Sequence, residues 1–136
     1  MDIEEARQFL RENHNVVLCT IRKNGEPALT PVTAGVDDEG YAVISSRETA
    51  YKVQHLRRDP RAWLCVLNPR FYGEWVLVQG TATIVSLPEA MEMLVDYYRG
   101  IAGEHPDWDD YRRARERDQR VIIRVAIERA GPDRHG

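Results

Sequence analysis

The sequence has little cysteine, with two residues among 136 and a long separation between them. They do not form the close pairs that bind zinc or exchange disulfides, so neither chemistry is predicted. Cys19 and Cys65 each lie inside a short apolar run, at residues 17–19 and 64–66. We therefore expect both to be small, buried core residues.

Long hydrophobic segments are also missing. No apolar run approaches 18 residues, and the acidic start Met1–Glu5 lacks the hydrophobic region of a signal peptide. The formal net charge is −3, which argues against general nucleic-acid binding. These absences predict a cytoplasmic protein that binds neither membranes nor nucleic acids.

The common catalytic signatures are absent from the sequence. It contains no P-loop and no Gly-x-Ser-x-Gly, His-Glu-x-x-His or Gly-x-Gly-x-x-Gly motif. The four histidines do not stand at metal-ligand spacing from one another, so no metal site is predicted. No side chain is identified as catalytic.

The pattern of apolar residues, turns and helix caps predicts six strands and four helices. The strands are expected at residues 16–21, 27–36, 41–45, 62–67, 75–85 and 121–127, and the helices at 2–13, 50–58, 86–98 and 107–117. No linker is long enough to divide the chain, so residues 1–136 are predicted to form one domain.

Three positions indicate that the strands curve into a small closed antiparallel barrel. Asn24-Gly25 is a strong hairpin signal, because both central turn positions require positive φ. Pro31 removes a backbone donor and so marks an edge or a bulge. Gly80 indicates a bend in the longest strand. Bent strands suit a barrel better than a flat sheet, so we predict a mainly β fold with peripheral helices.

Positive charge is concentrated in one part of this net-acidic chain. Residues 47–70 contain six basic and two acidic side chains, a local charge of +4. The segment Ser45–Lys52 lies between a predicted strand and a predicted helix. Hydroxyls, backbone N–H groups and a lysine converge there, which suits a phosphate at a helix N-terminus. The alternative is an ordinary charged surface, with Thr49 as the helix N-cap and Lys52 in solvent.

Two features extend this candidate site. Three arginines within residues 57–61 carry positive charge beyond the reach of one phosphate. Phe71, Tyr72 and Trp75 place aromatic rings next to the basic segment, which suits a flat ring system; core packing is the alternative for each ring.

Three segments resemble the pyridoxamine-phosphate-oxidase-like family of split barrels. Residues 17–27 are similar to the first hairpin of that family. Residues 45–61 resemble its phosphate-binding block, followed by a Leu-x-x-Asp-Pro-Arg turn at Leu56–Arg61. Tyr98–Arg112 resembles the branch whose members use the deazaflavin coenzyme F420. The resemblance covers nearly the whole chain.

The resemblance implies a six-stranded antiparallel split β-barrel with peripheral helices. It also implies a homodimer with two cofactor sites in grooves between the barrels. Lys52 is expected to bind the cofactor phosphate, and the outer arginines to face the acidic polyglutamate tail. The implied cofactor-binding residues are Lys52, Ser45, Ser46 and Thr49 near the phosphate, Thr30, Pro31 and Val32 along the ring edge, Arg22 and Arg57 toward the tail, and Trp75 in the groove.

Two positions depart from the family pattern. Ala50 stands where some relatives have a second basic residue, and Arg47 is a candidate substitute. Glu26 stands where a basic residue can help to hold the acidic tail. The resemblance nevertheless implies an F420-dependent oxidoreductase that transfers a hydride between the deazaflavin and a small electron-poor organic substrate. The alternatives are an FMN-dependent enzyme, which needs Lys52 but not the outer arginines, and a non-catalytic carrier of the cofactor.

Overall fold

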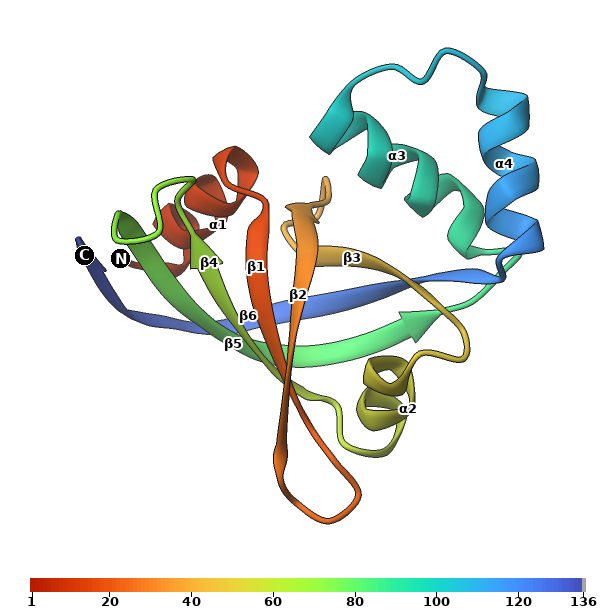
Figure 1. Ribbon diagram of the computed structural model, residues 1–136. Helices are drawn as coiled ribbons and strands as arrows, with labels where there is room; N and C mark the ends of the chain where they lie inside the picture. Colours follow the sequence, from red (N-terminus) through yellow and green to blue (C-terminus); the bar gives the residue numbers. More distant parts are fainter. Residues whose placement is uncertain (136) are drawn as a thin grey trace.

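The computed structural model describes residues 1–135, which form a closed six-stranded antiparallel barrel with four helices around it (Figure 1). The strands are β1 (Asn15–Ile21), β2 (Pro27–Val36), β3 (Ala42–Arg47), β4 (Arg61–Leu67), β5 (Glu74–Val85) and β6 (Arg120–His135). The helices are α1 (Ile3–Glu12), α2 (Tyr51–Arg58), α3 (Ala90–Ala102) and α4 (Trp108–Arg117). Around the barrel the order is β1-β2-β3-β6-β5-β4. The predicted fold class is confirmed.

Strand β2 has one free edge, which explains its proline. It pairs with β1 through residues 27–33 but with β3 only through residues 34–36. The Thr33 carbonyl points away from β1, because it accepts a hydrogen bond from the Tyr97 hydroxyl at 2.8 Å. Backbone groups two residues apart point to the same side, so Pro31 directs its missing N–H toward the free edge. The predicted edge position is confirmed.

The long pairing of β5 with β6 is bent at Gly80. The register shifts between Gln79 and Gly80, and a Cβ built on Gly80 would overlap the carbonyl oxygen of Ala126. Only glycine fits there, and the predicted bend in β5 is confirmed. Strand β6, however, continues to residue 135 rather than ending at residue 127. Its last part is polar and contains Gly131-Pro132, so it lacks an apolar strand pattern, but it pairs with the start of β5.

The core fills the barrel, and the helices cover its ends and one side. Leu18, Leu64 and Ile123 are fully buried inside. Helix α1, capped by Asp2 as predicted, contributes Phe9 and Leu10 to this core. Helix α3 packs on the outside of β3 and β6 in a second cluster, and the Tyr111 hydroxyl of α4 donates to a carbonyl of α3 at 2.7 Å. The α3–α4 unit therefore stands over the outer face of β3 (Figure 1).

Two local predictions are wrong. Cys19 and Cys65 are half-buried on the outer face of the barrel, because the inward positions of β1 and β4 are the even-numbered residues. Helix α3 begins at Ala90 rather than at residue 86, because the Ser86 hydroxyl donates to the Glu48 carboxylate at 2.8 Å instead of capping the helix. Among the described residues, no helix is long and apolar enough to cross a membrane.

Candidate functional site

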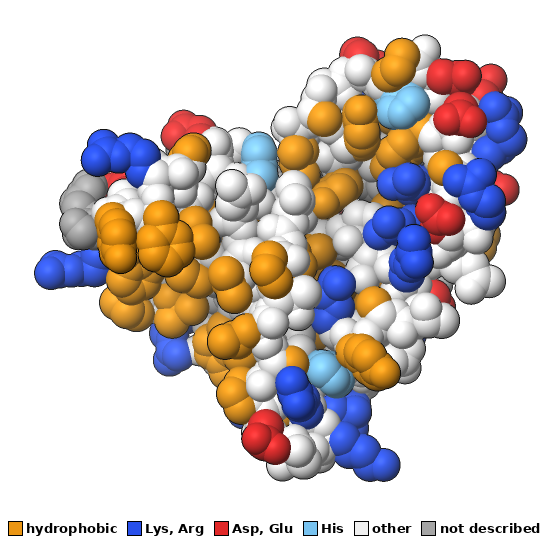
Figure 2. Space-filling view, viewed as in Figure 1, with side chains coloured by type: hydrophobic (Ala, Val, Ile, Leu, Met, Phe, Trp, Pro, Cys, Tyr) orange, Lys and Arg blue, Asp and Glu red, His pale blue; other side chains and the backbone are white. Residues whose placement is uncertain are grey.

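A basic pocket lies where β3 meets α2. Its volume is about 450 Å³, and its walls come from the end of β3, the start of α2 and the first residue of β6. The lining residues are Ser45, Ser46, Arg47, Thr49, Ala50, Tyr51, Lys52 and Arg120. Figure 2 shows Lys and Arg side chains gathered between α4 and α2. The structure thus brings together Ser45, Ser46, Thr49 and Lys52, the four residues predicted around a phosphate.

The N-terminus of α2 opens into this pocket without a cap. Its N-cap residue is Ala50, whose backbone is extended and which makes no side-chain cap hydrogen bond. The alternative in which Thr49 caps the helix is therefore wrong. Lys52 is half-buried rather than fully in solvent. Uncapped first-turn N–H groups beside a lysine can bind an anion.

The cations around this pocket repel one another. Burial lowers the pKa of Lys52, and the charge of Arg120 lowers it further. Burial also lowers the pKa of Arg120; Arg115 and Arg47 add to this effect, and Asp118 opposes it. Each shift reports that a positive charge is less stable here than in water. An anion bound in the pocket would remove this penalty.

Three buried polar atoms at this place have no hydrogen-bond partner among the described residues. They are the Ser45 Oγ, the Arg120 Nε and the Nε of the neighbouring Arg115. Buried polar atoms in folded proteins are nearly always paired. One hydroxyl and two guanidinium N–H groups suit a group with several acceptor oxygens. The residues present therefore fit the phosphate of a flavin-type cofactor.

Tyr97 of α3 connects the basic pocket to the free edge of β2. Its hydroxyl donates to the Thr33 carbonyl at 2.8 Å and takes a backbone hydrogen bond from Ser45. Burial raises the pKa of this phenol, and the Ser45 bond and the charge of Arg120 oppose the rise. Thr30, Pro31 and Val32, the predicted ring-edge segment, precede Thr33 on β2 and pair with residues 16–18 of β1. This segment therefore ends one residue before the Tyr97 contact, but none of its residues lines the basic pocket.

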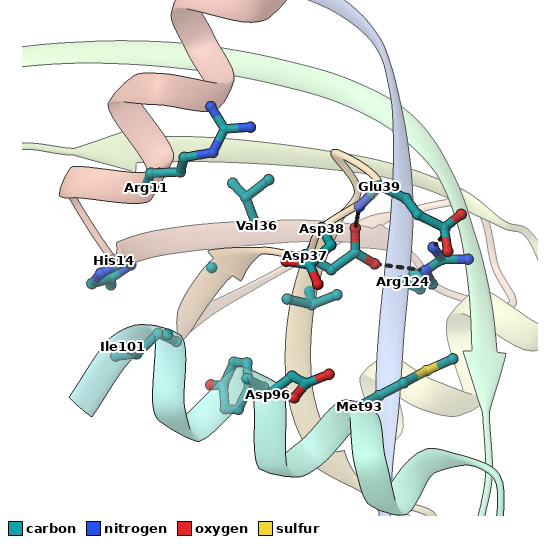
Figure 3. A pocket seen from close by; sticks show the side chains of 14 residues that line it. Arg11, His14, Val36, Asp37, Asp38, Glu39, Met93, Asp96, Ile101 and Arg124 are labelled. Atoms are coloured by element: carbon teal, nitrogen blue, oxygen red, sulfur yellow. Dashed lines mark hydrogen bonds and ion pairs between the residues drawn. The ribbon is translucent and has the colours of Figure 1, made fainter. Parts of the chain in front are cut away.

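A second pocket of about 600 Å³ lies between α1, the β2–β3 turn and α3 (Figure 3). Tyr97 lines it, and so does Val43, which precedes Ser45 by two residues on β3. Residues two apart on a strand share one face, so both pockets lie over the same face of β3. Tyr97 stands between them.

The two predicted tail residues lie outside the basic pocket. Arg57 forms an ion pair with Glu48, so its charge is already compensated. Arg22 lies toward the C-terminal end of α2: the pKa of His55 is lowered by burial and by the charges of Arg58 and Arg22. Arg58 also donates to the Ile21 carbonyl at 3.1 Å. Arg22 and Arg58 thus form a second cationic group, next to His55.

Trp75 lies far from Lys52 within one chain. It pairs with Leu67 at the start of β5, six residues before Thr81, which pairs with Arg61 just after α2. At about 3.3 Å per residue, that separation is about 20 Å. Phe71 and Tyr72, in the preceding loop, are 76% and 81% exposed, so they are not core residues.

The sequence interpretation missed Arg120, Arg115 and Tyr97. It expected a second cation near Lys52, noted Ala50 at the usual position and named Arg47 as a substitute. The second cation in the structure is Arg120 of β6, which reaches the pocket because it pairs with Arg47. The available signal was a basic residue at the very start of an apolar strand. Within the described residues, no group of three or more His, Cys, Asp or Glu could hold a metal ion.

The fold and this pocket can be compared with known proteins. A conserved hypothetical protein from Mycobacterium tuberculosis is 27% identical, with a TM-score of 0.78 over 96% of this chain and 82% of that chain. A structure described as an F420 reductase is 18% identical, with a TM-score of 0.71 over 92% and 94%. A heme binding protein from Mycobacterium smegmatis is 18% identical, with a TM-score of 0.70 over 98% of this chain and 57% of that chain.

At 18% identity, such likenesses show the fold alone. The family model described as pyridoxamine 5'-phosphate oxidase is more specific, because it matches residues 3–132 and so runs from the first helix into the last strand. Its span includes every residue of the basic pocket. The chain therefore belongs to the pyridoxamine 5'-phosphate oxidase family.

Proposed function

We propose that the protein is an oxidoreductase that uses the deazaflavin coenzyme F420 to transfer a hydride to or from a small electron-poor organic substrate. The observation that carries this proposal is the basic pocket, where Lys52 and Arg120 meet an uncapped helix N-terminus and unpaired buried donors. Family membership supports a flavin-type cofactor, and the likeness to an F420 reductase supports a deazaflavin.

The second cationic group favours the deazaflavin over FMN. Arg22 and Arg58 lie toward the far end of α2 from the Lys52 pocket, and an eight-residue helix is about 12 Å long. FMN carries one phosphate, which the first pocket satisfies. A cofactor with a phosphate and an acidic tail uses both groups. The carboxylate of Glu26 is held by the turn, because it accepts a hydrogen bond from the Asn24 side chain at 2.6 Å.

The protein side chains would bind and orient the cofactor. Lys52, Arg120 and the N–H groups of α2 neutralise the phosphate, and the Ser45 hydroxyl donates to it. Tyr97 fixes the Thr33 carbonyl and the Ser45 amide, and so holds the free edge of β2 against the pocket. When bound, the cofactor supplies the hydride chemistry, and the second pocket is placed to hold the other reactant.

We also propose that two copies of this chain form a homodimer through the outer face of β1, β4 and β5. Outward positions of an antiparallel sheet are usually polar where they meet water. Here they carry Val17, Cys19, Trp63, Cys65, Leu67, Trp75 and Leu77. Hydrophobic side chains gather over this side of the barrel (Figure 2). These side chains are half-buried within one chain, and a contiguous apolar surface of this kind marks an interface.

In a dimer of this kind, Trp75 can contact the cofactor bound by the partner subunit, which it cannot do within one chain. Because Trp75 lies about 20 Å along β5 from the end near α2, it can approach a cofactor only across an interface. Leu77→Asp should abolish the dimer, because it would bury an unpaired carboxylate. Thr83→Asp serves as an exposed control on the same strand. Sedimentation of a monomeric wild type would refute the dimer.

Titration of the purified protein with each cofactor, followed by fluorescence, tests the proposed activity. We expect F420 to bind more tightly than FMN, Lys52→Ala to weaken both, and Arg58→Gln to weaken F420 alone. Micromolar binding of FMN with no binding of F420 would instead identify an FMN-dependent enzyme. Tight binding of F420 without turnover of quinones, enones or nitroaromatics would identify a carrier.

A further inference from the structure

The second pocket combines an apolar floor with an acidic rim. Val36, Val43, Met93 and Ile101 contribute the apolar surface. Gly35 leaves room there, because a Cβ at this position would lie 3.3 Å from the Ile101 side chain. A volume of about 600 Å³ suits a small organic molecule.

The two arginines of this pocket are already engaged. Arg124 forms ion pairs with Asp37 at 2.8 Å and Glu39 at 3.2 Å, and its guanidinium lies 3.6 Å from the centre of the Tyr41 ring. Arg11 donates hydrogen bonds to the side chains of Glu4 and Gln8 on its own helix. The Nδ1 atom of His14 forms a hydrogen bond with the Ala34 carbonyl at 2.8 Å.

Two carboxylates remain without a partner. Asp38 on the β2–β3 turn and Asp96 on α3 make no hydrogen bond or ion pair with any residue that the structure describes. Figure 3 shows that Asp96 lies on the α3 side of the pocket and Asp38 on the side of the turn. The pocket therefore has an uncompensated charge of about −2 beside its apolar floor, opposite in sign to the Lys52 pocket on the other side of Tyr97.

We propose that this second pocket binds a small organic cation, with an apolar or aromatic body on the floor and its positive charge toward Asp38 and Asp96. Anions of the same shape are excluded by repulsion from both carboxylates. The two pockets then separate their ligands by charge: anionic groups bind at Lys52, and the cationic molecule binds between α1 and α3.

If the proposed oxidoreductase activity holds, on which this step rests, the cation is a hydride acceptor of the iminium or N-alkylpyridinium type. The acceptor forms a new C–H bond with a hydride from the reduced deazaflavin. Its C=N π electrons move to nitrogen, and the product is a neutral amine. The remaining proton of the reduced cofactor passes to solvent. Such an acceptor requires no proton from the protein, which agrees with the lack of an identified acid.

Binding of three bicyclic probes to the protein without cofactor tests the inference. N-methylquinolinium, 1-methylnaphthalene and 1-naphthoate have similar size and carry charges of +1, 0 and −1. Equilibrium dialysis with inorganic phosphate present to occupy the Lys52 pocket should give the tightest binding for the cation and the weakest for the anion. Asp38→Asn and Asp96→Asn should each weaken the cation up to about five-fold and leave the neutral probe unchanged. Asp109→Asn, on the exposed face of α4, is the matched control.

Amide chemical shifts locate the bound cation. We expect changes at Gly35 and Gly100, which line this pocket, and none at Ser46 or Lys52. Equal affinity for the three probes, an equal effect of Asp109→Asn, or shifts confined to the Lys52 pocket would each overturn the inference. Because no cofactor is present, failure of the F420 titration would leave these results unaffected.

Discussion

The sharpest consequence of the basic pocket concerns Arg120, the cation that the sequence interpretation did not find. Arg120→Gln keeps most of the side-chain length but removes the charge from the pocket. A hydrogen bond to a charged partner contributes about 1.5–3 kcal/mol. Its loss corresponds to a roughly 10- to 150-fold weaker binding of a phosphate-bearing cofactor. We expect this loss for both F420 and FMN, because both carry a phosphate.

The same substitution should not destabilise the ligand-free protein. Arg120 lies among Lys52, Arg47 and Arg115, and these charges lower its pKa after the effect of burial. Removing one of these like charges relieves repulsion. The free energy of unfolding in urea should therefore stay within about 0.5 kcal/mol of wild type or rise. This combination, weaker binding with retained stability, separates a ligand-binding arginine from a structural one.

Two assays measure the two halves of this prediction. Fluorescence titration gives the cofactor affinity, and thermal unfolding with and without inorganic phosphate gives the stabilisation by an anion alone. Phosphate should raise the Tm of the wild type more than that of Arg120→Gln. Arg113→Gln, on the exposed surface of α4, is the charge-matched control. Unchanged affinity in Arg120→Gln, or an equal loss in Arg113→Gln, would refute the assignment of the pocket.

Two further predictions concern stability. Gly80→Ala should destabilise the protein by about 1–3 kcal/mol or prevent folding, because its Cβ would overlap the Ala126 carbonyl. Gly100→Ala should stabilise the protein by up to about 1 kcal/mol, because the new Cβ would lie in open space on α3. Urea unfolding measures the free energy of unfolding of both variants. His55 has a pKa below its usual 6.5, so the unfolded chain binds its proton first and stability should fall as the pH drops from about 6.5 through the lowered value. His55→Gln should reduce the pH dependence of the unfolding free energy below pH 6.5; an unchanged slope would contradict the predicted proton linkage.

The fold could be predicted because its main signals are local. The Asn24-Gly25 turn, Pro31 at an edge and Gly80 at a bend each describe one place on the chain, and the structure has the hairpin, the edge and the bend. In the turn, however, Gly25 has positive φ and Asn24 does not, so the expectation of positive φ at both positions is wrong. The faces of the strands could not be assigned in the same way. Apolar residues occupy both faces of β1 and β4, so the alternation that separates core from surface is absent, and Cys19 and Cys65 were assigned to the core.

The site was predictable where its residues are adjacent in the sequence. Ser45–Lys52 is one segment, and the structure places four of its residues around one pocket. Arg120 reaches that pocket through sheet pairing, and helix packing places Tyr97 beside it; no local pattern encodes either contact. The exclusion of Arg57 likewise depends on Glu48, a partner that only the folded chain brings into contact.

The most direct test of the central claim is to measure the affinity of the wild-type protein for three related ligands. They are F420, FMN and the deazaflavin ring with its ribityl chain but without phosphate or tail. The two cationic groups at the ends of α2 predict the tightest binding for F420, intermediate binding for FMN and the weakest for the ring alone. Equal affinity for F420 and the ring alone would show that neither group of cations binds the cofactor, and would contradict the proposed role of both.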